Sequence, residues 1–89
     1  MKSINEFEEG KAVDEAGLRR FTEAMNAKLA KKRDEGRGGW HCNPSVYGDR
    51  GTSVERLKEM LHDHIKKGDM VDIANFAMMI WNREHPEGK

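Results

Sequence analysis

The sequence of 89 residues contains one cysteine, two prolines, few aromatic residues and no excess of charge of either sign. A single cysteine, Cys42, excludes an internal disulfide and favours a reducing compartment, which we expect to be the cytoplasm. No run of about 18 apolar residues occurs, so no membrane span is predicted. The first nine residues also lack the apolar segment of a secretory signal. Lys plus Arg and Asp plus Glu both number 16, which argues against nucleic acid as the main partner, because non-specific binding depends on cationic contacts.

The chain is also short of apolar material. Hydrophobic residues make up 36% of it, against about 45–50% in ordinary globular domains. A chain of this length buries only about 60–65% of its unfolded surface. We therefore expect one small domain over residues 13–89, preceded by a loose acidic arm over residues 1–12, and we expect self-association into a dimer or a larger assembly.

Apolar residues at three- and four-residue steps predict an all-α fold with three helices. The first begins between Asp14 and Leu18 and is ended by Asp34, Glu35 and Gly36. The second is capped by Thr52 or Ser53, with a capping box if Thr52 is the N-cap, and it ends at Lys67-Gly68. The third begins directly after Asp69, so the last two helices should form a tight hairpin. The predicted apolar stripes of the first two helices are Leu18, Phe21, Met25 and Leu29, and Val54, Leu57, Leu61, His64 and Ile65.

A glycine-rich loop over residues 36–51 separates the first two helices. Gly36, Gly38, Gly39 and Pro44 exclude regular helix or strand here. Loops of this length in a small domain are typically functional or disordered.

The third predicted helix is apolar on nearly every face. Ten of the twelve residues from 70 to 81 are apolar. Two other short helices can hardly cover such a helix, so the segment 70–81 is the predicted interface between copies of the chain.

Several acidic residues could bind a hard cation such as Mg²⁺. Glu59 and Asp63 are four residues apart on one helix, and Asp72 lies three residues before Asn75 in the most apolar helix. The plainer alternatives are a solvated face for Glu59 and Asp63, support of the helix N-terminus for Asp72, and a backbone hydrogen bond for Asn75.

A basic cluster could instead bind phosphate. Lys31, Arg33 and Arg37 lead into the glycine-rich loop and Trp40, and cations, backbone N–H groups and an aromatic face together suit a nucleotide. The loop lacks the G-K-[ST] of a Walker A motif. The alternative is that these cations only complement the helix dipole.

Three segments carry a resemblance to known proteins. Residues 27–33 (AKLAKKR), 38–40 (GGW) and 72–79 (DIANFAMM) resemble small bacteriophage-encoded proteins. Those proteins in turn resemble the MazG-like all-α nucleoside triphosphate pyrophosphohydrolases, and the resemblance spans roughly residues 24–83. It implies an all-α scaffold and, in the enzymes, Mg²⁺ held by acidic motifs on two helices.

Only some of the acidic residues of the two enzyme motifs have counterparts in this sequence. Glu59 matches the first acid of the E-E-x-x-E motif and Asp63 the third, while Met60 replaces the second. Asp69 and Asp72 stand for the E-x-x-D motif, and the resemblance gives Asn75 a ligand-side role. The segment between the two motifs is short, and it places Asp69 and Asp72 at a helix start.

With the resemblance, these observations predict a non-catalytic interaction protein of phage type that binds a host protein or a nucleotide and needs no cofactor. The resemblance also implies that the cytoplasm in question is that of a bacterial host. In this interpretation Lys31, Arg33, Arg37, Trp40 and Asn75 form the phosphate or nucleotide site. The alternative is a Mg²⁺-dependent nucleoside triphosphate pyrophosphohydrolase with Glu59, Asp63 and Asp72 on the metal. A nucleic-acid-binding accessory protein is the second alternative.

Overall fold

The computed structural model describes residues 4–42 and 51–87, and within them the chain is all-α, as predicted. The three helices are α1 (Ile4–Asp34), α3 (Val54–Lys67) and α4 (Met70–Glu84). No strand occurs among the described residues. Part of the predicted loop over residues 36–51 lies outside the described residues.

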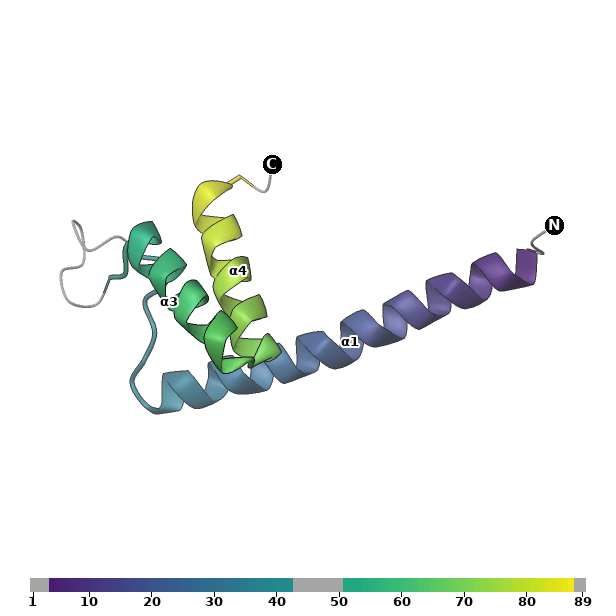
Figure 1. Ribbon diagram of the computed structural model, residues 1–89, viewed down its shortest axis with the longest axis horizontal. Helices are drawn as coiled ribbons and strands as arrows, with labels where there is room; N and C mark the ends of the chain where they lie inside the picture. The colour runs from purple at the N-terminus through teal and green to yellow at the C-terminus, as the bar shows by residue number, and fades with distance from the viewer. Residues whose placement is uncertain (1–3, 43–50, 88–89) are drawn as a thin grey trace.

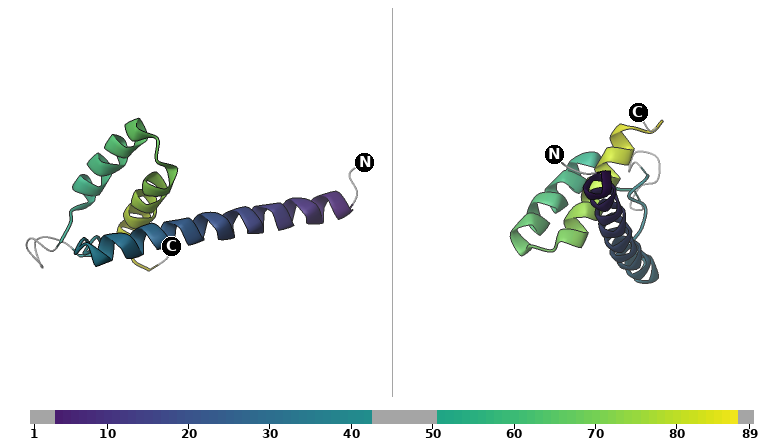
Figure 2. Two further views of the ribbon diagram at one scale, coloured as in Figure 1. Left: turned by 90° about the horizontal axis from the view of Figure 1, so that it is seen from below. Right: turned by 90° about the vertical axis from the view of Figure 1, so that its right-hand side faces the viewer.

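Helix α1 is longer than the sequence pattern indicates. The predicted start between Asp14 and Leu18 is wrong, because the helix begins at Ile4 and passes through Gly10 and the expected boundary at residues 12 and 13 without a break. The segment from Ile4 to Asp34 contains no proline, and its Ala, Glu, Lys and Arg residues favour helix strongly enough to tolerate two glycines. The first half of α1 projects away from the other two helices (Figures 1 and 2).

The core lies where α3 packs on α4 and α4 in turn packs on the second half of α1 (Figure 2). Its buried apolar residues are Leu57 of α3 and Phe76, Met79 and Ile80 of α4. The partly buried side chains around them are Leu29, Trp40, Val54, Met60, Leu61 and Met78. The core therefore draws on all three helices and on the segment that follows α1.

The helix ends use local hydrogen bonds. Ser53, one of the two predicted caps, is the N-cap of α3, and its side chain accepts a hydrogen bond from the Arg56 N–H. The capping box that depended on Thr52 as N-cap therefore does not apply. Gly68 ends α3 at φ +76°, where a side chain would be strained, and Asp69 caps α4 by accepting from the N–H groups of Val71 and Asp72. Only Gly68 and Asp69 separate α3 from α4.

Parts of the predicted apolar stripes lie outside the core. Leu18 is 67% exposed and Ile65 is 52% exposed, because α4 covers only the second half of α1 and one side of α3. Helix α4 is not covered on every face either, since Met70 and Trp81 are about half exposed. Its role as an interface between copies of the chain stays a prediction.

Replacing Leu57 should test the position of the core. Leu57 is 1% exposed, so Leu57→Ala should lower the free energy of unfolding by about 2–5 kcal/mol. The matched Ile65→Ala, on the exposed side of the same helix, should cost less than about 1 kcal/mol. Urea unfolding followed by circular dichroism measures both, and equal losses would contradict the packing.

Candidate functional site: a basic-rimmed apolar pocket

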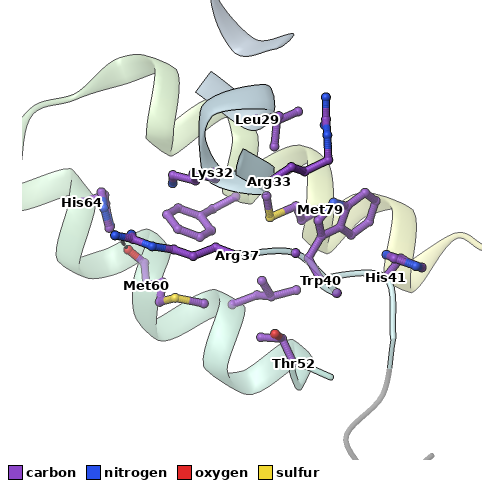
Figure 3. Close-up of a pocket in the computed structure, with 14 residues that line it drawn as sticks. Leu29, Lys32, Arg33, Arg37, Trp40, His41, Thr52, Met60, His64 and Met79 are labelled. Atoms are coloured by element: carbon purple, nitrogen blue, oxygen red, sulfur yellow. Dashed lines mark hydrogen bonds between the residues drawn. The ribbon is translucent and has the colours of Figure 1, made fainter. Parts of the chain in front are cut away.

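A pocket of about 350 Å³ opens between the end of α1, the segment after it, and the facing sides of α3 and α4. Its volume lies at the lower end of the range for small-molecule sites, about 300–1,000 Å³. Figure 3 shows its lining residues, with Arg37 pointing toward His64 and Trp40 beside Met79. The lining residues are Leu29, Lys32, Arg33, Arg37, Gly38, Gly39, Trp40, His41, Thr52, Leu57, Met60, His64, Phe76 and Met79.

Apolar side chains form the inner wall of the pocket. Leu57, Phe76 and Met79 are buried, and they belong both to the core and to the lining. Trp40 packs against this cluster and is itself partly buried. The pocket therefore offers an apolar, partly aromatic surface of the kind that a planar ring can contact.

The end of α1 directs the chain into the pocket. The N–H of Gly36 bonds to the Arg33 carbonyl and the N–H of Arg37 bonds to the Lys32 carbonyl, which is a Schellman motif with Gly36 at φ +81°. Gly39 also has a positive φ, of 82°. These two glycine conformations reverse the chain and carry Arg37, Gly38 and Trp40 to the pocket.

Arg83 of α4 connects the segment that follows α1 with the residues that precede α3. Its Nη1 lies 2.6 Å from the carbonyl oxygen of Trp40 and 2.6 Å from that of Thr52. The N–H of Thr52 in turn donates to the Cys42 carbonyl at 2.8 Å. One guanidinium on the most apolar helix thus positions Trp40 and the start of α3 relative to each other.

Three cationic side chains line the pocket, and they differ in their ion-pair partners. Lys32 lies 3.3 Å from a carboxylate oxygen of Asp72 and over the Phe76 ring. Arg37 has only an exposed pair with Glu35 at 3.3 Å, and such pairs contribute little. Arg33 makes no ion pair with another described residue. The guanidinium groups of Arg33 and Arg37 can therefore bind an anion that enters the pocket.

Asp72 is a buried carboxylate beside the pocket. It is 7% exposed, and the Nζ atoms of Lys28 and Lys32 lie 3.5 and 3.3 Å from its oxygens. The Nε2 of His64 lies 3.7 Å from the same carboxylate, while the Nδ1 of His64 faces the Met60 carbonyl at 2.8 Å. Since a carbonyl only accepts, Nδ1 is the donor in that contact.

Lys28 also binds Asp69, the N-cap of α4, at 3.0 Å. This hydrogen bond, followed by the charge of Asp72, raises the pKa of Lys28 above its ordinary value of 10.5. The same hydrogen bond lowers the pKa of Asp69 below its ordinary value of 3.8. The pair therefore favours the charged form of both groups and joins α1 to the start of α4.

The three acids proposed for Mg²⁺ do not come together. Glu59 is exposed and pairs with Arg56 at 3.1 Å, Asp63 is exposed on α3, and Asp72 is occupied by lysines. Within residues 4–42 and 51–87 no three His, Cys, Asp or Glu side chains gather into a group that could hold a metal ion.

The predicted phosphate residues divide into two sets. Arg33, Arg37 and Trp40 line the pocket, whereas Lys31 is exposed outside it. Asn75 is 1% exposed and donates to the Met25 carbonyl at 3.3 Å, so it joins α4 to α1, as in the plainer alternative. Its Oδ1 has no hydrogen-bond partner among the described residues.

Sequence reasoning did not assign Met60, Thr52, His64 or Arg83 to the site. A signal was present for two of them. His64 falls on the apolar stripe of its helix, four residues after Met60, and Arg83 follows Ile80 by three residues on the buried side of α4. A charged residue on a buried face needs acceptors nearby, which is the role that Arg83 has here.

Comparison of the chain with protein-family models, with curated proteins and with solved structures finds no match. The likeness to the MazG-like enzymes and the phage origin therefore stay predictions. Among the described residues, no helix combines the length and the apolar character that crossing a membrane requires.

The Lys28–Asp69 pair should make stability depend on pH at both extremes. Because the pKa of Asp69 is lowered in the folded state, its contribution is present above about pH 3.8 and is lost as the pH falls through the folded value. Because the pKa of Lys28 is raised, its contribution is present below about pH 10.5 and is lost at higher pH. The difference in melting temperature between wild type and Lys28→Met should shrink on both sides of this window. Lys11→Met, in an exposed pair with Glu15, should differ little from wild type at any pH.

Removal of the Arg83 guanidinium should loosen the segment that contains Trp40 and Cys42. Arg83→Met leaves the Trp40 and Thr52 carbonyls without their donor, and a hydrogen bond to a charged group contributes about 1.5–3 kcal/mol. Faster alkylation of Cys42, which is partly buried, would show that this segment has loosened. Arg56→Met, which removes an exposed guanidinium from α3, is the control. Unchanged Cys42 reactivity in Arg83→Met would contradict the role given to Arg83.

Proposed function

We propose that the protein is a non-catalytic binding protein whose pocket takes a single nucleotide. The observation that carries the proposal is the combination of Arg33 and Arg37 with an apolar wall that includes Trp40. Two guanidinium groups at the edge of a pocket suit a phosphate group, because arginine binds phosphate oxygens through paired N–H donors.

The two parts of a nucleotide match the two parts of the pocket. The phosphate would contact Arg33 and Arg37, next to the glycines at 38 and 39, where the backbone has no side chain to keep a ligand away. The base would lie against Trp40 and the buried side chains of Phe76 and Met79. A volume of about 350 Å³ suits one nucleotide better than a dinucleotide.

The positions of the acidic residues favour nucleotide binding over nucleotide hydrolysis. Asp72, the one buried acid among the described residues, has lysines on both of its carboxylate oxygens. Glu59 and Asp63 are exposed on α3 and do not line the pocket. No group of acids among the described residues supports the metal-assisted attack of water that the pyrophosphohydrolase alternative needs.

Fluorescence of Trp40 tests the proposal directly. Trp81 is half exposed and stacks on His85 away from the pocket lining, so Trp81→Phe leaves Trp40 as the only indole. Titration of this variant with nucleoside mono-, di- and triphosphates and with inorganic phosphate should change the Trp40 emission, and nucleotides should bind more tightly than phosphate. Arg37→Gln should weaken binding about tenfold or more, as expected for loss of a charge-assisted hydrogen bond.

Arg56→Gln is the matched control, because it removes one positive charge on α3 outside the pocket and should leave the affinity nearly unchanged. Absence of any Trp40 response at millimolar nucleotide would overturn the proposal, as would equal losses in Arg37→Gln and Arg56→Gln. Release of pyrophosphate or monophosphate from a triphosphate in the presence of Mg²⁺ would show that the protein is an enzyme instead. Tighter binding of an oligonucleotide than of any nucleotide would favour the nucleic-acid alternative.

A further inference from the structure

One side of α4 is left largely uncovered by the rest of the described chain. Met70 is 59% exposed and Trp81 is 48% exposed, although α4 is the most apolar of the three helices. Figure 1 shows α3 along one side of α4 and α1 crossing its N-terminal end. The apolar residues from 70 to 81 are therefore divided between the core and a second, exposed side of the helix.

The residues on this exposed side have the spacing of a seam between two packed helices. Successive members are separated by four, three and four residues, so they lie on one side of α4, and we call them the α4 seam: Met70, Ala74, Ala77 and Trp81. Ala77 is exposed and Ala74 is partly exposed. The one charged residue from 70 to 81 is Asp72, which is buried on the opposite side of the helix. The seam is therefore an apolar surface without a charge.

The α4 seam has the same pattern of side-chain size in both directions along the helix. A large side chain, Met70 or Trp81, stands at each end, and the two alanines stand in the middle. When two copies lie antiparallel, the alanines of one copy lie beside the alanines of the other, where small side chains let the two backbones approach. Met70 then lies beside the partner's Trp81. A surface that matches itself in this way suits a two-fold contact between identical chains.

The charges at the two ends of the α4 seam favour the antiparallel orientation. Glu84 follows Trp81 by three residues and continues the seam, while Lys66 and Lys67 are exposed in the last turn of α3, directly before α4. In a parallel pair Glu84 would lie beside the partner's Glu84, and like charges across an interface are costly. In an antiparallel pair Glu84 lies near the partner's Lys66 and Lys67, in addition to its exposed pair with Lys58 within the chain.

We propose that two copies of this chain pair through their α4 seams in the antiparallel orientation, with the two-fold axis between Ala74 and Ala77. Trp81 is prepared for this contact, because its ring stacks on His85 at a centroid distance of 4.7 Å and little side-chain freedom is lost on binding. The seam is short, so the dimer should dissociate reversibly at micromolar concentration. None of the seam residues lines the pocket, so the dimer does not rest on the proposed nucleotide function.

Sedimentation of seam variants tests the pairing. The wild type should be a dimer at about 0.1 mM, and Ala77→Glu should be a monomer, because it places two like charges beside the axis. Trp81→Ala should weaken the dimer about tenfold or more, as expected for a large aromatic residue at an interface. Ala16→Glu is the matched control, because it makes the same change at an exposed position of α1, and it should leave the dimer unchanged.

A wild type that is a strict monomer at this concentration would overturn the proposal, and so would a dimer that survives Ala77→Glu. Glutamate is nearly as good a helix former as alanine, so the circular dichroism of Ala77→Glu should match that of the wild type and show that the variant is folded. A dimer that dissociates in Leu18→Glu but not in Ala77→Glu would place the interface on α1 and contradict the pairing through α4.

Disulfide trapping tests the orientation. In a Cys42→Ser background, a mixture of one chain carrying Met70→Cys with another carrying Trp81→Cys should form the mixed disulfide under mild oxidation, because the two positions are neighbours in the antiparallel pair. Either variant alone should cross-link slowly, because the two copies of one position are then separated by 11 residues of helix, about 16 Å at 1.5 Å per residue. Rapid cross-linking of Met70→Cys to itself would indicate a parallel pair and would overturn the antiparallel arrangement.

Discussion

The buried carboxylate of Asp72 is the constraint on which the arrangement of the three helices depends. A buried charge is costly unless it is paired, and Asp72 is paired with Lys28 and Lys32 of α1 and faces His64 of α3. Each of these groups comes from a different helix than Asp72 itself. Loss of either lysine leaves a buried acid with fewer partners, so the ion pairs fix where α1 lies along α4.

The ion pairs of Asp72 with Lys28 and Lys32 matter because α1 contributes few apolar contacts to the core. Of its side chains, Leu29 packs against the core cluster, and the remaining connections to α4 run through Lys28, Lys32 and the carbonyl of Met25. Apolar burial therefore holds α3 and α4 together, while charge and hydrogen bonding hold α1 in place. The pocket forms at this junction, which explains why one side of it is apolar and the other side is cationic.

Local signals in the sequence predicted the number of helices and some of their ends, but not the full length of α1. Gly68 suits the end of a helix and Asp69 suits the start of one, and both residues have these predicted roles. The start of α1 was predicted wrongly because Gly10 and Gly17 suggest a boundary, whereas the absence of proline and the strong helix formers around them let the helix continue.

The candidate site was predictable to a similar degree. Arg33, Arg37 and Trp40 could be found because they cluster in the sequence, next to glycines that mark a reversal of the chain. His64 and Arg83 could not be assigned to the site, because their partners lie on other elements and depend on how the helices cross. Asn75 was open to two interpretations, and only the position of Met25 decides that it bonds to α1.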